Sequence, residues 1–148
     1  MPSLLAEMER VVKKAKAAQA EFRSFQQEQI DEIIKKIAEV TYKEAAFLAK
    51  LAVEETGMGV MEHKKIKNEL GSMGVYESIK DEKTTGIICQ DRKNKITEIA
   101  YPLGVIAAIC PTTNPTSTAI YKTLISLKAQ NGIVVSPHPN AKNVRSKH

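Results

Sequence analysis

The chain has 148 residues, of which 43% are hydrophobic and 26% charged, and it carries a formal net charge of +5. This length accommodates one domain or part of one and excludes two full catalytic domains. The composition is that of a folded globular protein rather than a disordered one, and no apolar run approaches the roughly 18 residues that cross a bilayer.

Charge and cysteine content limit the partners, the compartment and the kinds of site to expect. The lysines are spread along the expected helices and aromatic residues make up only 5% of the chain, so we expect no nucleic-acid partner and ascribe the charge to a solvated surface or an anionic cofactor. Cys89 and Cys110 match no metal-ligand spacing and are too few for a disulfide framework. No signal-type apolar core is present. We therefore expect a cytoplasmic protein without a metal site.

The first 84 residues are expected to form helices in series. Apolar residues recur at helical spacing from Leu4 onward and predict a helix that ends near Phe22. Ser24 followed by Gln27 has the spacing of a capping box and predicts the start of a second helix, in which isoleucines repeat at helical spacing.

Two further helices are expected before residue 84. Thr41 and Glu44 repeat the capping-box spacing and predict a third helix that ends at Thr56–Gly57. Residues 62–83 predict a fourth helix with a weaker pattern, because two glycines in its interior each cost about 1 kcal/mol relative to alanine.

Short β-type runs follow the helices. Ile87 to Gln90 and Ile96 to Tyr101 are separated by a polar stretch, a pattern that predicts a β-hairpin.

The last part of the chain predicts one βαβ unit. Gly104 to Cys110 is a continuous apolar run, as expected of a strand buried on both faces of a parallel sheet. Asn114–Pro115 supplies a preferred N-cap followed by proline at the first helical position, and Asn131–Gly132 ends that helix. Ile133 to Val135 predicts the second buried strand.

The expected fold class is α/β, with N-terminal helices (1–84), a hairpin (85–101) and a first βαβ unit (102–148). A sheet with so few strands is not expected to form a stable domain by itself. Residues 141–148 are polar and basic, as if another helix began or a tail followed. The pattern therefore indicates an incomplete domain.

Several stretches resemble the CoA-acylating branch of the aldehyde dehydrogenase family. They are Tyr101–Val105, the turn Pro111–Thr118, the loop Ser136–Pro139, and the upstream segments Glu54–Gly59 and Asp81–Thr84. The sequence of these segments is most similar to that of the aldehyde half of bifunctional aldehyde–alcohol dehydrogenases. The likeness spans nearly the whole chain and implies the leading portion of an aldehyde dehydrogenase domain, including the first βαβ unit of its Rossmann-like coenzyme domain.

The resemblance implies an oxidoreductase that interconverts acetaldehyde, or another short aldehyde, plus CoA and NAD with acyl-CoA and NADH through a cysteine thioester. It implies that Asn114 donates a hydrogen bond to the oxyanion and that Pro111, Thr112 and Thr113 line the nicotinamide side of the cleft. Relatives of this kind assemble into homo-oligomers or filaments.

The loop after the second strand is less informative. Ser136 stands where many relatives place a lysine against the adenosine ribose, and His138 is a candidate contact to a cofactor phosphate or CoA. Residues 136–140 offer no acidic side chain to accept from a ribose 2′-hydroxyl, so NAD is expected on the resemblance alone. Structural roles remain open beside these: Asn114 as a plain helix cap, and His138 as a loop-shaping residue.

Neither cysteine suits the nucleophile. Cys110 ends a buried strand, where a thiol behaves as a small hydrophobe, and Cys89 has no nearby base in the sequence. The resemblance implies a nucleophile beyond residue 148, so we expect the isolated chain to be inactive. Two other functions stay open: a noncatalytic interaction module that joins full-length relatives through its hairpin edges, and a helical adaptor, which the caps between the helices disfavour.

Overall fold

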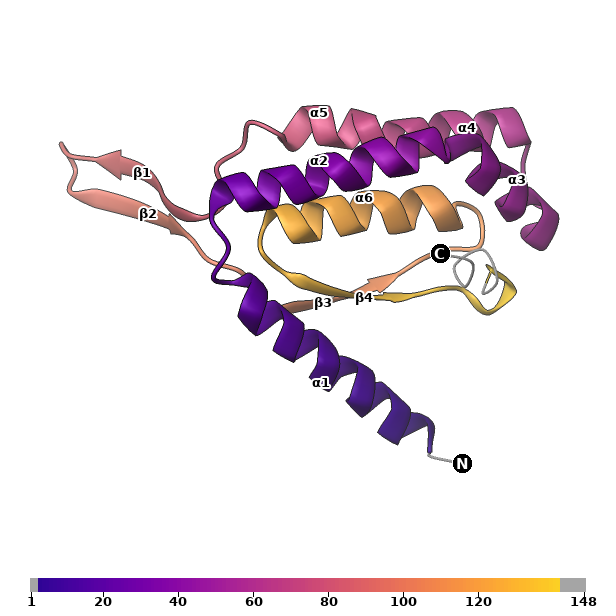
Figure 1. Ribbon diagram of the computed structural model, residues 1–148, viewed down its shortest axis with the longest axis horizontal. Helices are drawn as coiled ribbons and strands as arrows, with labels where there is room; N and C mark the ends of the chain where they lie inside the picture. The colour runs from indigo at the N-terminus through magenta and orange to yellow at the C-terminus, as the bar shows by residue number, and fades with distance from the viewer. Residues whose placement is uncertain (1–2, 142–148) are drawn as a thin grey trace.

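The computed structural model describes residues 3–141 and shows helices, a hairpin and a βαβ unit in the expected order (Figure 1). The elements are α1 (Leu4–Phe22), α2 (Gln27–Lys43), α3 (Ala45–Thr56), α4 (Met61–Glu69), the π-helical turn η1 (Leu70–Gly74), α5 (Val75–Ile79), β1 (Gly86–Asp91), β2 (Ile96–Ala100), β3 (Val105–Ile109), α6 (Pro115–Lys128), β4 (Gly132–Ser136) and the 3-10 turn η2 (Pro139–Ala141). Of the polar stretch expected at residues 141–148, all but Ala141 lies outside the described residues.

Strands β3 and β4 pair in parallel, in a register that runs from Val105 opposite Gly132 to Ile109 opposite Ser136. Helix α6 connects them and covers one face of this two-stranded sheet, while α1 crosses the other face (Figure 1). A Cβ built on Gly132 would lie 3.1 Å from the Gln19 Cβ, so the absence of a side chain at Gly132 lets α1 approach the start of β4. The predicted βαβ unit is confirmed.

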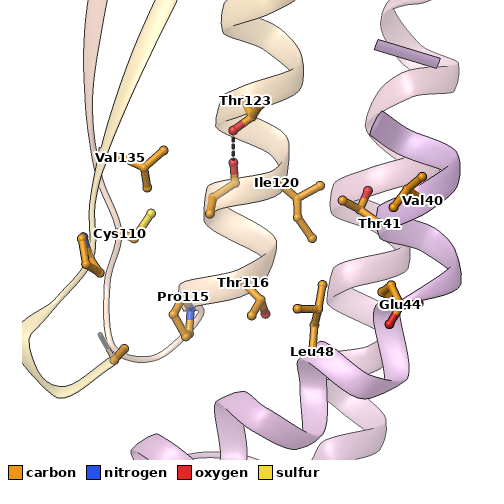
Figure 2. Close-up of a pocket in the computed structure, with 13 residues that line it drawn as sticks. Val40, Thr41, Glu44, Leu48, Cys110, Pro115, Thr116, Ile120, Thr123 and Val135 are labelled. Atoms are coloured by element: carbon orange, nitrogen blue, oxygen red, sulfur yellow. Dashed lines mark hydrogen bonds between the residues drawn. The ribbon is translucent and has the colours of Figure 1, made fainter. Parts of the chain in front are cut away.

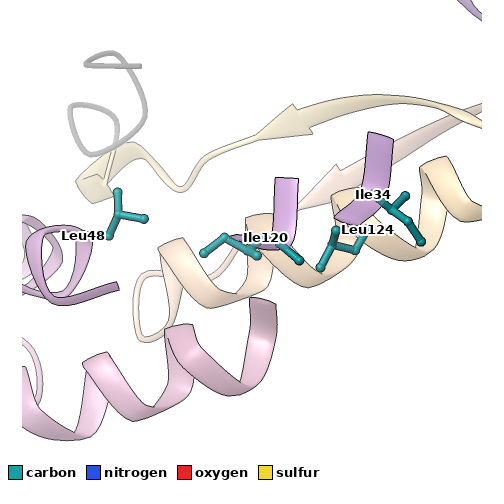
Figure 3. Close-up of a cluster of buried hydrophobic side chains, with 5 residues drawn as sticks. Ile34, Leu48, Ile120 and Leu124 are labelled. Carbon is teal, nitrogen blue, oxygen red and sulfur yellow. The ribbon is translucent and has the colours of Figure 1, made fainter. Parts of the chain in front are cut away.

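The hydrophobic core lies between α2, α3 and α6 (Figure 3). Ile34 and Leu124 are fully buried there, with Leu48 and Ile120 beside them. These side chains come from helices far apart in the sequence, so the βαβ unit is fastened to the N-terminal helices by apolar packing.

Two of the predicted helix starts are wrong. Ser24 still belongs to the turn that ends α1, where its Oγ donates to the Glu21 carbonyl at 2.8 Å. The N-cap of α2 is Gln26, whose backbone N–H donates to Gln29 Oε1 at 2.9 Å. Thr41 lies inside α2 and its Oγ1 donates to the Ile37 carbonyl at 2.7 Å. In both cases a side-chain hydroxyl bonds to the preceding helical turn instead of opening a new helix.

The glycine-containing fourth helix is present but carries a π-bulge. Helix α4, η1 and α5 follow one another without a break, and the π-helical turn contains both Gly71 and Gly74. A Cβ built on Gly71 would lie 3.1 Å from the Ser117 carbonyl oxygen. The glycine at position 71 therefore permits close packing of η1 against the start of α6.

The strands are less buried than the sequence predicts. Ala108 is 2% exposed, but its neighbour Ile109 is 73% exposed. Helix α1 approaches the amino-terminal end of the sheet, near Gly132, and leaves the carboxyl-terminal end of β3 uncovered among the described residues. The expectation of burial on both faces is therefore wrong for Ile109.

The hairpin β1–β2 is antiparallel, with a bulge between Ile87 and Cys89, and it projects away from the helices (Figure 1). Asp91 organises its turn by accepting hydrogen bonds from the backbone N–H groups of Lys93 and Asn94, each at 3.0 Å. These contacts lower the pKa of the Asp91 carboxyl, the Asn94 backbone bond most of all.

Within residues 3–141, no helix combines the length and the apolarity that crossing a bilayer requires.

Replacing Leu124 with Ala is expected to destabilise the chain by about 2–5 kcal/mol, because it removes a fully buried side chain and leaves a cavity. The adjacent Ile125 is 44% exposed, so Ile125→Ala is the matched control and is expected to cost less than about 1 kcal/mol. Urea unfolding followed by circular dichroism measures both. Equal losses would contradict the assignment of the core.

Two alanine substitutions in the π-bulge are expected to act in opposite directions. Gly71→Ala should destabilise by about 1–3 kcal/mol, because the new methyl group would press on the Ser117 carbonyl. Gly74→Ala should stabilise by about 0.5–1 kcal/mol, because its methyl group would meet nothing closer than 3.5 Å and helix propensity rises. Thermal unfolding of the two variants tests the contrast, and a stabilising Gly71→Ala would refute the close approach.

Candidate functional site

The turn that leaves β3 lies at the carboxyl edge of the parallel sheet. Cys110 follows the last residue of β3, and its backbone N–H donates to the Ser136 carbonyl at the end of β4 at 2.9 Å. The segment 111–114 then leads into α6, which begins at Pro115. The structure thus brings the predicted residues 111–114 and Ser136 to the same edge, where open α/β sheets bind ligands.

Helix α4 holds this turn and the start of α6 through three polar side chains. Lys64 Nζ donates to the Thr113 carbonyl oxygen at 2.7 Å, and Lys67 Nζ donates to Asn114 Oδ1 at 2.9 Å. These residues and Asn68 are spaced three and four apart, which places them on one face of a helix.

Asn68 is 1% exposed and joins three parts of the chain. Its Nδ2 donates to the Ala45 carbonyl at 3.0 Å, while its Oδ1 accepts from Thr116 Oγ1 at 2.7 Å. The amide therefore fixes the first turn of α6 against the start of α3.

Asn114 is the N-cap residue of α6 by position, but its side chain makes no capping hydrogen bond. The predicted position of Asn114 as the N-cap of α6 is therefore confirmed, while the side chain is free of the usual capping bond. Its Oδ1 accepts from Lys67, and Pro115 at the first helical position has no N–H that needs an acceptor. The Nδ2 group donates to Thr113 Oγ1 at 3.5 Å, a long contact that leaves its N–H groups available for a stronger acceptor.

Lys64 is 5% exposed, and its ammonium contacts a neutral carbonyl. Burial lowers the pKa of the Lys64 ammonium below its ordinary value, and the positive charge of Lys67 lowers it further. Gly59 adjoins this side chain, since a Cβ built there would lie 3.3 Å from Lys64 Cε.

The remaining predicted site residues are accessible. Pro111, Ser136 and His138 are exposed and Thr112 is half-buried. His138 Nδ1 accepts from the Asn140 backbone N–H at 3.2 Å, so this nitrogen shapes the loop after β4, while the rest of the ring faces solvent. Both readings of His138, loop-shaping and ligand-binding, are compatible with this placement.

A cavity of about 420 Å³ adjoins the turn on the side of α2 and α3 (Figure 2). It is lined by side chains of α2, α3, α6 and the ends of both strands, among them Leu48, Cys110, Thr116, Ile120 and Val135. None of the predicted site residues 111–114, 136 and 138 lines it. The cavity and the Asn114 amide are therefore separate features of this edge.

The two cysteines occupy different surroundings. Cys110 is 2% exposed and lines the cavity, whereas Cys89 is exposed on β1 of the projecting hairpin. A buried thiol on an apolar wall is disfavoured as a thiolate. The exclusion of both residues as nucleophiles stays a prediction.

Sequence reasoning did not single out Lys64, Lys67 or Asn68. Lysines on helices are ordinary surface residues, and the segment carried a weak helical pattern. The available signal was the spacing of the polar residues 64, 67 and 68, which places them on one face of the helix. Their contacts with the turn and with α6 became visible only in the tertiary structure.

Within residues 3–141, no group of three or more His, Cys, Asp or Glu side chains is arranged to hold a metal ion.

Lys64 should titrate below 10.5, and Lys67→Met should raise its pKa part of the way back, because burial remains after the neighbouring charge is gone. The unfolded chain binds more protons between the lowered folded pKa and 10.5, so the Lys64 contribution to stability should rise with pH across that window. Below this window Lys64 is charged in both the folded and the unfolded state, and burying the charged ammonium destabilises the fold to its full extent. A ¹³Cε NMR titration checks this, with Lys65→Met as control, and Lys64 titrating at 10.5 or above would contradict it.

Comparison with known proteins places the chain among relatives. The sequence model described as "Aldehyde dehydrogenase family" matches residues 4–146. The chain is 48% identical over 143 residues to the bifunctional aldehyde-alcohol dehydrogenase AdhE of Escherichia coli, a match that covers 97% of this chain and 16% of that protein. It is 51% identical over 136 residues to the aldehyde-alcohol dehydrogenase of Clostridium acetobutylicum, with 92% and 16% covered.

The solved structures agree with the sequences. The acetylating aldehyde dehydrogenase of Geobacillus thermoglucosidasius aligns with a TM-score of 0.92 and 48% identity, covering 94% of this chain and 31% of that one. The chain therefore spans less than a third of these relatives. Because the family match includes nearly every residue, the chain belongs to the aldehyde dehydrogenase family, where it matches the N-terminal part of the acylating members.

Proposed function

We propose that this chain forms the oxyanion side of an acylating aldehyde dehydrogenase that interconverts acetaldehyde or another short aldehyde, CoA and NAD with acyl-CoA and NADH. The observation that carries the proposal is the Asn114 amide at the carboxyl edge of the sheet, with Oδ1 held by Lys67 and Nδ2 left to donate. We also propose that residues 1–148 form the leading portion of one catalytic domain rather than a domain of their own.

The chemistry asks for a donor at this position. When a cysteine thiolate attacks an aldehyde or thioester carbonyl, negative charge develops on the carbonyl oxygen, and a donor placed in advance stabilises it. An amide donates without changing its charge state. Asn114 would supply that donor, and a cysteine outside this chain would be the nucleophile, since Cys110 is buried and Cys89 is remote on the hairpin.

The residues present fit a nicotinamide cofactor at this edge. The first turn of α6 carries no acidic side chain, so it offers no carboxylate that would repel a pyrophosphate. Thr112, Thr113 and Ser136 supply hydroxyl groups that are at least partly exposed. NAD supplies the hydride acceptor when bound, and CoA supplies the thiol that takes up the acyl group; Pro111 and His138 complete the proposed contacts.

A second candidate function follows from the hairpin. Strands β1 and β2 project from the helices (Figure 1), and Ile87, Ile96 and Ile99 are each more than two-fifths exposed. Exposed apolar side chains on strands with open edges favour pairing with another chain. The alternative is thus a noncatalytic module that associates with a full-length relative, or a homo-oligomer formed through the same hairpin.

The test is a chimera in which this chain replaces the matched segment of the Geobacillus acetylating aldehyde dehydrogenase, which supplies the rest of the domain. We expect acetyl-CoA-dependent NADH oxidation from the chimera and none from the 148-residue chain alone. Asn114→Ala should lower kcat by about 100-fold to 1,000-fold, as expected for the loss of one oxyanion donor. Asn94→Ala, in the exposed turn of the β1–β2 hairpin and away from the sheet edge, is the control.

Three results would decide against the proposal. A chimera that unfolds cooperatively yet lacks activity would contradict the assigned side of the active site, and full activity of Asn114→Ala would contradict the role of its amide. Activity of the chain alone would contradict the external nucleophile. Co-purification of the chain with the intact relative, together with an inactive chimera, would favour the interaction module.

A further inference from the structure

We propose that Lys67 is a positioning residue whose ammonium fixes the orientation of the Asn114 amide, so that Nδ2 and not Oδ1 faces the reacting carbonyl oxygen. The inference rests on the proposed function of Asn114. It assigns a role in the reaction to a residue of α4, which lies outside the strand–turn–helix segment.

The chemistry of the pair selects one of two amide orientations. The Asn side chain ends in an acceptor and a donor of nearly equal size, whereas an ammonium carries donors only. With Lys67 Nζ 2.9 Å away, the Asn114 atom that faces it must be Oδ1. A turned amide would place N–H groups against the ammonium and present oxygen to the developing negative charge, which would repel it.

The contact also strengthens the donor. A hydrogen bond from a charged group to the amide oxygen draws electron density toward that oxygen and leaves the Nδ2 protons more positive. The Nδ2 group has one weak contact of its own, to Thr113 Oγ1 at 3.5 Å. Within residues 3–141 the structure shows no other acceptor for it, so the polarised N–H groups are available to a substrate.

The backbone beneath the amide is held by the same helix. Lys64, one turn before Lys67, donates to the Thr113 carbonyl at 2.7 Å. Two neighbouring residues are thus held by α4: Thr113 through its backbone carbonyl and Asn114 through its side chain. Lys65, which lies between the two lysines, instead pairs with Glu69 at 2.9 Å.

The exposure of Lys67 allows its positioning role to be tested without a change in stability. Lys67 is exposed, and exposed polar contacts of this kind contribute little to the free energy of unfolding. Removing its ammonium should therefore leave the fold intact while freeing the amide to rotate.

The catalytic test uses four variants of the chimera. Lys67→Met should lower kcat about tenfold, less than the loss of the donor itself, with the KM for NADH and the melting temperature unchanged. Lys67→Arg should recover most of the activity, because a guanidinium also only donates. Lys65→Met removes the same charge from the same helix and should leave kcat unchanged, and Asn114→Ala reports on the donor.

The chimera also supplies a readout that needs no activity. In ¹H–¹⁵N spectra, Lys67→Met should move the Asn114 side-chain amide signals toward those of a solvated asparagine and speed their exchange, whereas Lys65→Met and Lys67→Arg should leave them near their original positions. Unchanged signals in Lys67→Met would overturn the proposal.

The two proposals fail in different ways. If Asn114→Ala keeps full activity, the donor role itself is wrong. If Asn114→Ala loses activity but Lys67→Met behaves like Lys65→Met, Asn114 acts without Lys67 and only the positioning role is refuted. If Lys67→Arg is as impaired as Lys67→Met, the orientation of the amide does not depend on a donor-only side chain.

Discussion

The hydrogen bonds from α4 to the turn after β3 are the constraint on which the candidate site depends. A turn between a parallel strand and its helix has few ladder contacts of its own, so its shape has to come from neighbouring elements. Here Lys64 fixes the Thr113 carbonyl, Lys67 the Asn114 amide and Asn68 the Thr116 hydroxyl. The all-helical first half of the chain therefore does more than cover the sheet: it sets the geometry of the sheet's carboxyl edge.

Packing makes that contact possible. A Cβ built on Gly71 would lie 3.1 Å from the Ser117 carbonyl oxygen, so this glycine permits close packing of η1 against the start of α6. Leu124 joins α6 to α2 in the core. The π-bulge interrupts the regular α-helix at this close approach. Such bulges occur frequently at functional sites. Backbone packing from η1 thus holds the start of α6, and polar contacts from α4 hold the turn that precedes it.

Much of the fold was predictable because its signals are local. The apolar runs on either side of α6, the Asn114–Pro115 start and the Gly57 end follow from the residues themselves. The structure confirms each of them: β3 and β4 pair in parallel, Asn114 is the N-cap of α6 and Gly57 is the C-cap of α3. The predicted helix starts at Ser24 and Thr41 were wrong, because each hydroxyl bonds backward to the preceding helical turn. Lys67 could not be found at all, since its acceptor lies 47 positions away in the sequence and only tertiary packing brings the two together.

The most direct measurement is a crystal structure of the chimera trapped with an acyl group on its nucleophilic cysteine. We expect Asn114 Nδ2 to lie within about 3.2 Å of the acyl oxygen, with Lys67 Nζ still bonded to Oδ1. An acyl oxygen bound elsewhere, or an Asn114 amide that has left Lys67 to reach it, would contradict the claim that α4 sets the donor before the substrate arrives.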